Sequence, residues 1–136
     1  MNNPNLKYTY NTPEEVIASL ENAYNNNDLV AIINSRDFIE EAKFVLEEAG
    51  YEFDATDELL LEETAKLLQM GLTQSLNEDG FPDFSHLKSE LYGLEKVNDV
   101  IYVINQKNTY PDNTTHETRI FLSYKNNVWK VALIEE

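Results

Sequence analysis

The sequence predicts an α+β fold in which helices precede a four-stranded antiparallel sheet. Three observations predict it. The last third of the chain reads as four consecutive strands, turn-forming residues separate them, and the chain before residue 87 shows mainly helical periodicity. The expected strands span residues 87–97, 100–107, 117–125 and 128–134, with turns at 98–99, 109–115 and 126–127.

Side-chain caps predict where the first three helices begin. Thr12 is followed by proline and two glutamates, so it supplies a capping hydroxyl before a proline at the first helical position. Asp28 is expected to cap a short second helix. A third helix is expected over residues 38–49, capped by Asp37 or Ser35.

The longest expected helix spans residues 58–77 and is capped by Thr56 or Asp57. Gly71 lies inside this helix, where glycine costs about 1 kcal/mol relative to alanine. We therefore expect Gly71 to mark a close packing contact. The residues that form the single apolar face of this helix are Leu61, Ala65, Leu68, Leu72 and Leu76.

Length and composition predict one domain, residues 1–136, that is large enough to bury a core. The chain has no cysteine, so the sequence predicts neither a disulfide framework nor a thiolate metal site. No stretch has the pattern of a signal peptide or the length to span a membrane. The expected location is therefore the cytoplasm.

The formal net charge of −15 is unevenly distributed. Residues 1–86 hold 18 acidic and 4 basic side chains, a net charge of −14, whereas residues 87–136 hold 7 and 6, a net charge of −1. So acidic a chain is repelled by nucleic acid and by anionic membranes, but it suits a basic protein partner. The asymmetry indicates an interaction face within the helical part.

The last three expected strands are apolar at both parities, as in Val100, Ile101, Tyr102, Val103 and Ile104. A sheet with one wet face alternates cleanly between apolar and polar residues. The helices account for the cover on one face. We therefore expect the other face to be covered by a second subunit, in a homodimer formed through the sheet.

Four short motifs accompany this order of elements. They are Thr12-Pro13-Glu14-Glu15, then Asp37-Phe38 followed by Glu41-Ala42, then Gly80-Phe81-Pro82, and finally Asn127-Val128-Trp129-Lys130-Val131. Together they resemble the nuclear transport factor 2-like superfamily and, within it, small bacterial immunity proteins. The resemblance implies a cone in which a curved sheet wraps a long helix. The superfamily includes isomerases, dehydratases, cyclases, transport adaptors and immunity proteins, so the fold alone does not decide function.

Acidic residues concentrate between residues 47 and 63. They are typical either of a solvated helix face with capping residues or of a docking surface for a cationic protein. We interpret them as the surface through which an immunity protein finds a basic toxin, since a toxin that attacks nucleic acid must be basic to hold its substrate. The expected partner-binding residues are Glu47, Glu48, Glu52, Asp54, Glu58, Glu62 and Glu63.

The alternative function is a small-molecule-binding protein, or an isomerase- or dehydratase-like enzyme, that uses the inside of the cone. The expected pocket residues are Tyr24, Tyr92, Tyr102 and Trp129, although each also suits a core or rim position. Tyr24, Tyr92 and Tyr102, with His86 or Glu90, could form an acid–base set. The sequence predicts no catalytic residue, cofactor or metal ligand.

The inside of the cone discriminates between these two functions. An open pocket with a buried carboxylate or histidine would favour a small-molecule function. A cone filled by leucine, phenylalanine and tryptophan would favour binding through the outer surface.

Overall fold

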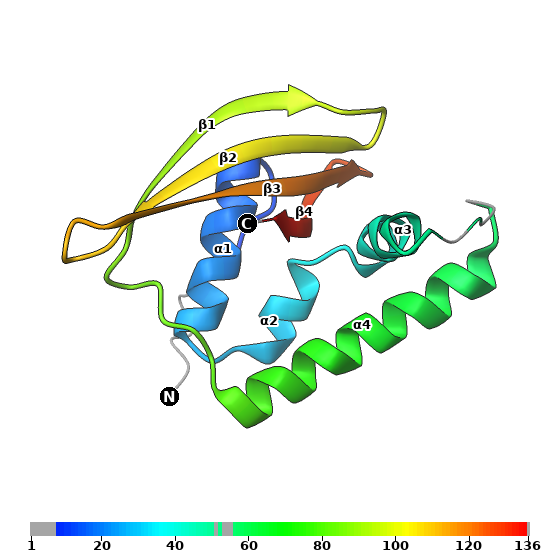
Figure 1. Ribbon diagram of the computed structural model, residues 1–136, viewed down its shortest axis with the longest axis horizontal. Coiled ribbons are helices and arrows are strands. Elements are labelled where there is room, and N and C mark those ends of the chain that lie inside the picture. Colours follow the sequence, from blue (N-terminus) through cyan, green and yellow to red (C-terminus); the bar gives the residue numbers. More distant parts are fainter. Residues whose placement is uncertain (1–7, 51, 53–55, 136) are drawn as a thin grey trace.

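The computed structural model describes residues 8–50, 52 and 56–135, and in that part of the chain four helices precede a four-stranded sheet (Figure 1). The predicted α+β class and the order of its elements are confirmed. The elements are α1 (Pro13–Asn25), α2 (Leu29–Asn34), α3 (Phe38–Glu48), α4 (Glu58–Asp79), β1 (Lys88–Lys96), β2 (Ile101–Thr109), β3 (Thr115–Lys125) and β4 (Val128–Glu135).

Each helix begins at a side-chain cap that the sequence predicts. Thr12, Asp28, Asp37 and Asp57 each accept a hydrogen bond from the backbone N–H three residues later, at 3.0 to 3.1 Å. Of the alternatives, Asp37 and Asp57 are therefore the caps. Ser35 instead ends α2, where its buried Oγ donates to a backbone carbonyl of that helix.

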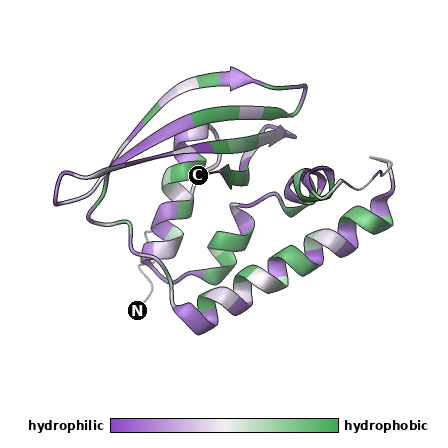
Figure 2. Cartoon of the chain, viewed as in Figure 1, coloured by the Kyte–Doolittle hydropathy of each residue, from purple (hydrophilic) through white to green (hydrophobic). Residues whose placement is uncertain are grey.

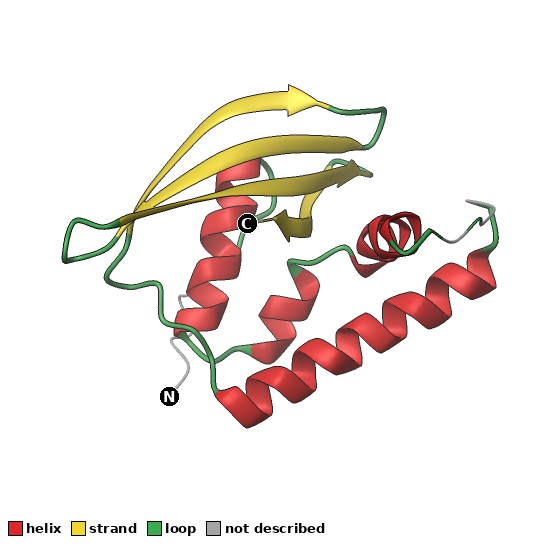
Figure 3. Ribbon diagram, in the orientation of Figure 1, coloured by secondary structure: helices red, strands yellow, loops and turns green. Residues whose placement is uncertain are grey.

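The strands pair in the order β1-β2-β3-β4, and every pair is antiparallel. β2 and β3 extend two residues further than predicted on either side of their turn, because the polar pairs Asn108–His116 and Thr109–Thr115 continue the ladder. A prediction that relies on alternating apolar residues cannot include these polar residues at the ends of the strands. Register shifts in the β1–β2 and β3–β4 pairs add local irregularity to a visibly curved sheet (Figure 3).

The helix inside the curve of the sheet is α1, and not the longest helix, α4. Val16 and Leu20 of α1 are buried in one cluster with Ile104, Ile120 and Leu122 of the sheet. The longest helix, α4, lies away from the sheet (Figure 1) and packs on α3 through a second small core. That core consists of Ala42, Leu46, Leu61 and Ala65.

The face of β3 that points away from α1 is covered in part by α3. The rings of Phe44 in α3 and Phe121 in β3 lie 5.0 Å apart between centroids. Elsewhere this face carries polar rows, such as Asn105 beside Arg119. Polar residues occupy much of this face, so the prediction of a largely apolar outer face is wrong. Its apolar part is covered by α3. The homodimer that the predicted apolar face suggested stays a prediction.

Gly71 does not mark a close packing contact. A Cβ atom added there would meet no other heavy atom within 4 Å, so the sequence-based expectation is wrong. The residue is exposed on α4. We see no packing reason for glycine at this position.

Candidate functional site

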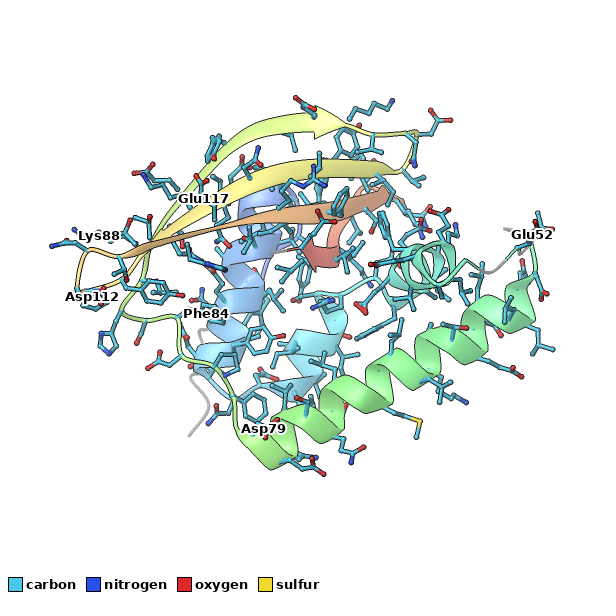
Figure 4. All side chains as sticks on the ribbon, viewed as in Figure 1. Glu52, Asp79, Phe84, Lys88, Asp112 and Glu117 are labelled. Atoms are coloured by element: carbon cyan, nitrogen blue, oxygen red, sulfur yellow. The ribbon has the colours of Figure 1, made fainter. Side chains whose placement is uncertain are left out.

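The acidic residues of the third and fourth helices come together at one end of the molecule. Glu47 and Glu48 end α3, Glu58 begins α4, and the two helices pack against each other. Figure 4 places Glu52 beside the start of α4, whereas Asp79 lies at the opposite end of that helix. We call the exposed residues Glu47, Glu48, Glu52, Glu58, Glu62 and Glu63 the acidic end. Asp54, the seventh predicted residue, lies outside the described residues.

Within the described part of the chain, no residue of the acidic end forms an ion pair. The nearest cation along α4 is Lys66, four residues after Glu62, and no ion pair joins it to any described carboxylate. By contrast, Lys43 pairs with Glu40 at 2.9 Å, away from this surface. The acidic end therefore presents its negative charge to the solvent without compensation from any residue that the structure describes.

Exposed apolar side chains are interleaved with these carboxylates. Leu59, Glu63 and Leu67 step by four along α4, so they lie on one line of the helix surface. Leu59 is 66% exposed and Leu67 is 67% exposed. Figure 2 shows hydrophobic and hydrophilic stretches alternating along α4. Apolar centres with a charged surround are typical of surfaces that bind other proteins.

A second candidate site is a cavity of about 230 Å³ between α1 and the inner face of the sheet. Most of its wall is apolar, including Ile17, Leu20 and Ile120. Phe84 lies in the segment between α4 and β1 (Figure 4) and lines part of the cavity. Its ring packs on that of Tyr24, with the centroids 5.6 Å apart.

The polar part of this wall includes Glu21, Gln106 and Thr118, together with Asn108, Tyr110 and His116. The Nε2 of Gln106 donates to Oε2 of Glu21 at 3.1 Å, across 85 positions of sequence. Burial raises the pKa of the Glu21 carboxyl, although the Gln106 hydrogen bond opposes that shift. Thr118 is the cross-strand neighbour of Gln106, and its buried Oγ1 has no hydrogen-bond partner among the described residues.

The structure brings only one of the four predicted pocket residues to the cavity. Tyr24 is buried and lines it. Trp129 is a core residue, 9% exposed, between the rings of Tyr102 and Tyr124. Tyr92 is exposed on β1, where its hydroxyl donates to Glu117. The four side chains therefore do not form one site, and the candidate partners His86 and Glu90 are both exposed.

Three residues of this polar wall, Glu21, Gln106 and Thr118, were not among those that the sequence singles out. Glu21 resembles any charged residue of an amphipathic helix. The available signal is on the strands, where Gln106 and Thr118 occupy the same inward rows as Ile104 and Ile120. The next pair in these rows, Asn108 and His116, is also polar, so one end of the inner face is polar, which indicates a polar partner in the helix opposite.

The inside of the cone has features of both candidate functions, binding through the outer surface and binding of a small molecule. Apolar side chains of α1, α2 and the sheet fill most of it. A cavity with a largely buried carboxyl remains at one side. The filled part favours binding through the outer surface, and the cavity favours a small molecule.

A broad groove of about 880 Å³ also runs between α4 and the β3–β4 turn. It is lined by four basic side chains, of which Arg36 pairs with Glu41, and Lys125 pairs with Asp37 and Glu40. Two of the four charges are thus neutralised within the chain. The groove is less distinctive than the acidic end.

Within residues 8–50, 52 and 56–135, no group of three or more His, Cys, Asp or Glu side chains is arranged to hold a metal ion. No helix in that part of the chain is both long and apolar enough to cross a membrane.

No family model matches the chain, and no curated protein matches it. A solved structure does: a crystal structure at 2.00 Å from Campylobacter jejuni, named "Putative NTF2-like transpeptidase". The superposition has a TM-score of 0.50 at 16% sequence identity and covers 90% of this chain and 99% of that one. The chain has the nuclear transport factor 2-like fold. At this identity the likeness shows the fold alone, which agrees with the superfamily resemblance of the sequence.

Proposed function

We propose that this protein of nuclear transport factor 2-like fold is a non-enzymatic binding protein that captures a basic protein at its acidic end. The observation that carries the proposal is the row of exposed Leu59, Glu63 and Leu67 on α4, beside carboxylates that form no ion pair among the described residues. The biological role that fits is that of a cytoplasmic immunity protein, which neutralises a basic toxin.

The two kinds of side chain contribute differently to such binding. Long-range attraction between the acidic end and a basic surface raises the rate of encounter, which matters for a protector that must act before the toxin does. The apolar side chains lose water only on contact, so they slow dissociation. A surface of charge alone would supply speed without much affinity.

Neutralisation by co-expression tests this proposal. The product of the gene adjacent to the one encoding this protein is expressed from an inducible promoter, with and without this protein. We expect growth arrest without it and rescue with it, and a stable complex on size-exclusion chromatography. The acidic-end variant described in the Discussion should rescue less well. Rescue that is identical with the acidic-end variant would contradict docking at this surface.

The cavity favours a second candidate function, which is the binding of a small molecule. The specific observation is that one cavity wall holds a largely buried Glu21 carboxyl and a buried Thr118 Oγ1 with no hydrogen-bond partner among the described residues. A buried carboxyl with a raised pKa also has the property that a general acid needs, so an isomerase- or dehydratase-like activity belongs to this candidate. Filling the cavity with Thr118→Leu should abolish small-molecule binding and leave capture of the basic protein unchanged.

A further inference from the structure

The outer side of α4 carries an exposed row of residues that ends in glycine. Leu59, Glu63, Leu67 and Gly71 follow one another at intervals of four, so they form one ridge of the helix surface. All four are exposed. The helix lies at the edge of the molecule, with α2 and α3 on its inner side (Figure 1). The row therefore extends the surface of the acidic end toward the middle of α4.

Gly71 has no role in the packing of the chain itself. Glycine inside a helix lowers stability relative to alanine, and an added Cβ atom at this position would meet no neighbouring heavy atom within 4 Å. The backbone does not require glycine either, because Gly71 lies inside α4 and its φ angle is not positive. A glycine of this kind suits a position where another backbone approaches closely.

The missing side chain widens a groove on the surface of α4. Lys66, Met70 and Gln74 form the next row of the helix, also at intervals of four and also exposed. Leu67, which is 67% exposed, and Met70, which is 59% exposed, give the groove apolar sides next to Gly71. Ridges of one helix pack into such grooves of another, and the side chains at the contact set how closely the two axes approach. The groove therefore fits an α-helix.

Charge decides between a second copy of α4 and a different helix. Along its whole described length α4 carries five carboxylates and one lysine, so its net charge is −4. Two copies of this helix repel each other, whereas a helix rich in lysine or arginine is attracted. The basic side chains of such a helix have acceptors beside the groove, in the exposed carboxylates of Glu62 and Glu63.

We propose that the partner docks through an amphipathic α-helix, rich in lysine or arginine, that crosses α4 with its closest approach at Gly71. The apolar face of that helix covers Leu67 and Met70, and its basic side chains face Glu62 and Glu63. This inference rests on the proposed function, which is capture of a basic protein, and it names the part of the partner that makes the contact.

Two synthetic peptides of about 18 residues, which is about five helical turns, test the proposal. Both contain the same numbers of alanine, leucine and lysine residues. In the first peptide the leucines recur at intervals of three and four and form one face, and in the second they are spread around the helix. Each peptide is titrated into the full-length protein. Amide nitrogen–proton correlation spectra locate the binding surface, and circular dichroism follows helix formation in the peptide.

We expect the first peptide to become helical on binding. It should give saturable shifts centred on Leu67, Met70 and Gly71, because its apolar face enters the groove. The second peptide has the same charge without that face, so it should bind about tenfold more weakly.

Variants at Gly71 separate binding from stability. Gly71→Ala should raise the melting temperature, because alanine favours a helix, and should still weaken binding of the first peptide severalfold. Gly71→Leu should weaken binding about tenfold or more, because the larger side chain fills the groove. Ala18→Leu adds bulk at an exposed position of α1, so it should bind the peptide as the wild type does. A variant that is more stable but binds less well cannot be explained by damage to the fold.

The contrary outcomes separate helix docking from the capture of a basic protein. If both peptides bind equally, if Gly71→Leu keeps full affinity, or if the shifts are confined to the acidic end, helix docking is wrong while capture by the acidic charge stands. If neither peptide binds, helix docking is also wrong, and the co-expression assay decides separately whether a basic protein is captured.

Discussion

Ser123 in β3 donates a hydrogen bond from its Oγ to Oδ2 of Asp37, the residue that caps α3, at 2.7 Å. The two residues are 86 positions apart. The other Asp37 oxygen accepts the backbone N–H of Glu40, and Lys125 lies 3.2 Å from the carboxylate. One carboxylate thus starts a helix and also ties it to the sheet.

Asp37→Ala should destabilise the protein by about 3 kcal/mol, because it removes a helix cap and a hydrogen bond to a charged group. Ser123→Ala should cost about 1–2 kcal/mol. Urea denaturation measures both losses. A Ser123→Ala variant as stable as the wild type would show that the hydrogen bond from Ser123 to Asp37 adds no stability.

The stability of the protein should depend on pH through the Asp37 carboxylate. Burial raises the pKa of Asp37, but the hydrogen bonds from Ser123 and Glu40 and the charge of Lys125 outweigh it, so the pKa lies below 3.8. The contribution is therefore present above pH 3.8 and is lost as the pH falls through the lower, folded-state pKa. Wild type and Asp37→Ala should converge in stability at very acidic pH.

Trp129→Ala should act as a folding mutation. The indole is stacked on Tyr124 at 4.5 Å and meets the Tyr102 ring edge-on at 4.9 Å, within the main core. Truncating a large buried aromatic side chain typically costs about 3–5 kcal/mol. Thermal unfolding measures the loss, and an unchanged melting temperature would mean that Trp129 is not a core residue.

Glu21 should lower stability at neutral pH. Its pKa is raised above 4.5 by burial, so its contribution is favourable below that value and is lost as the pH rises through the folded-state pKa. Glu21→Gln should therefore be at least as stable as the wild type at pH 7, with the difference shrinking toward pH 4. Glu14→Gln is the control with the opposite sign, since Glu14 favours the first turn of α1. A wild type that gains stability relative to Glu21→Gln on going from pH 4 to pH 7 would contradict the raised pKa.

The sequence predicts local features of this fold better than long-range ones. The caps Thr12 and Asp57 and the Asn126-Asn127 turn, with its positive φ angles of 52° and 63°, depend on a few neighbouring residues. The cover of β3 by α3 involves a contact between Phe44 and Phe121, which are far apart in the sequence, so no local pattern reveals it. The sequence therefore did not reveal that α3 covers part of the outer face, and the homodimer stays a prediction.

The same contrast between local and long-range features applies to the two candidate sites. Clustering of Glu47 and Glu58 follows from two consecutive helices that pack as a pair, so the sequence could predict it. The set formed by Glu21, Gln106 and Thr118 requires knowing that α1, and not the longest helix, lies inside the sheet. That choice depends on packing between distant residues.

Leu67→Ala should weaken capture of the basic partner by about 1 kcal/mol, mainly through faster dissociation. Folding stability should change by no more than about 0.5 kcal/mol, because the side chain is exposed. Val30→Ala is the matched control, since Val30 is as exposed but lies on α2. Surface plasmon resonance gives both rate constants. Equal effects of the two substitutions would rule out α4 as the contact surface.

The association rate with the basic partner tests the central claim most directly. Reversing Glu47, Glu48, Glu58 and Glu62 to lysine changes the net charge from −15 to −7, because each of the four reversals adds two charges. Reversing Glu78, Asp79, Glu90 and Glu95 makes the same change at exposed positions away from the acidic end. Both variants should stay folded, since exposed substitutions usually cost within about 0.5 kcal/mol each.

Stopped-flow mixing measures that rate for the wild type and both variants, from about 0.05 M to about 0.5 M salt. We expect the acidic-end variant to associate roughly tenfold more slowly at low salt, with a much smaller loss in the control, and the difference to fade as salt screens the charges. An unchanged rate and salt dependence in the acidic-end variant, or an equal loss in both variants, would contradict docking at the acidic end.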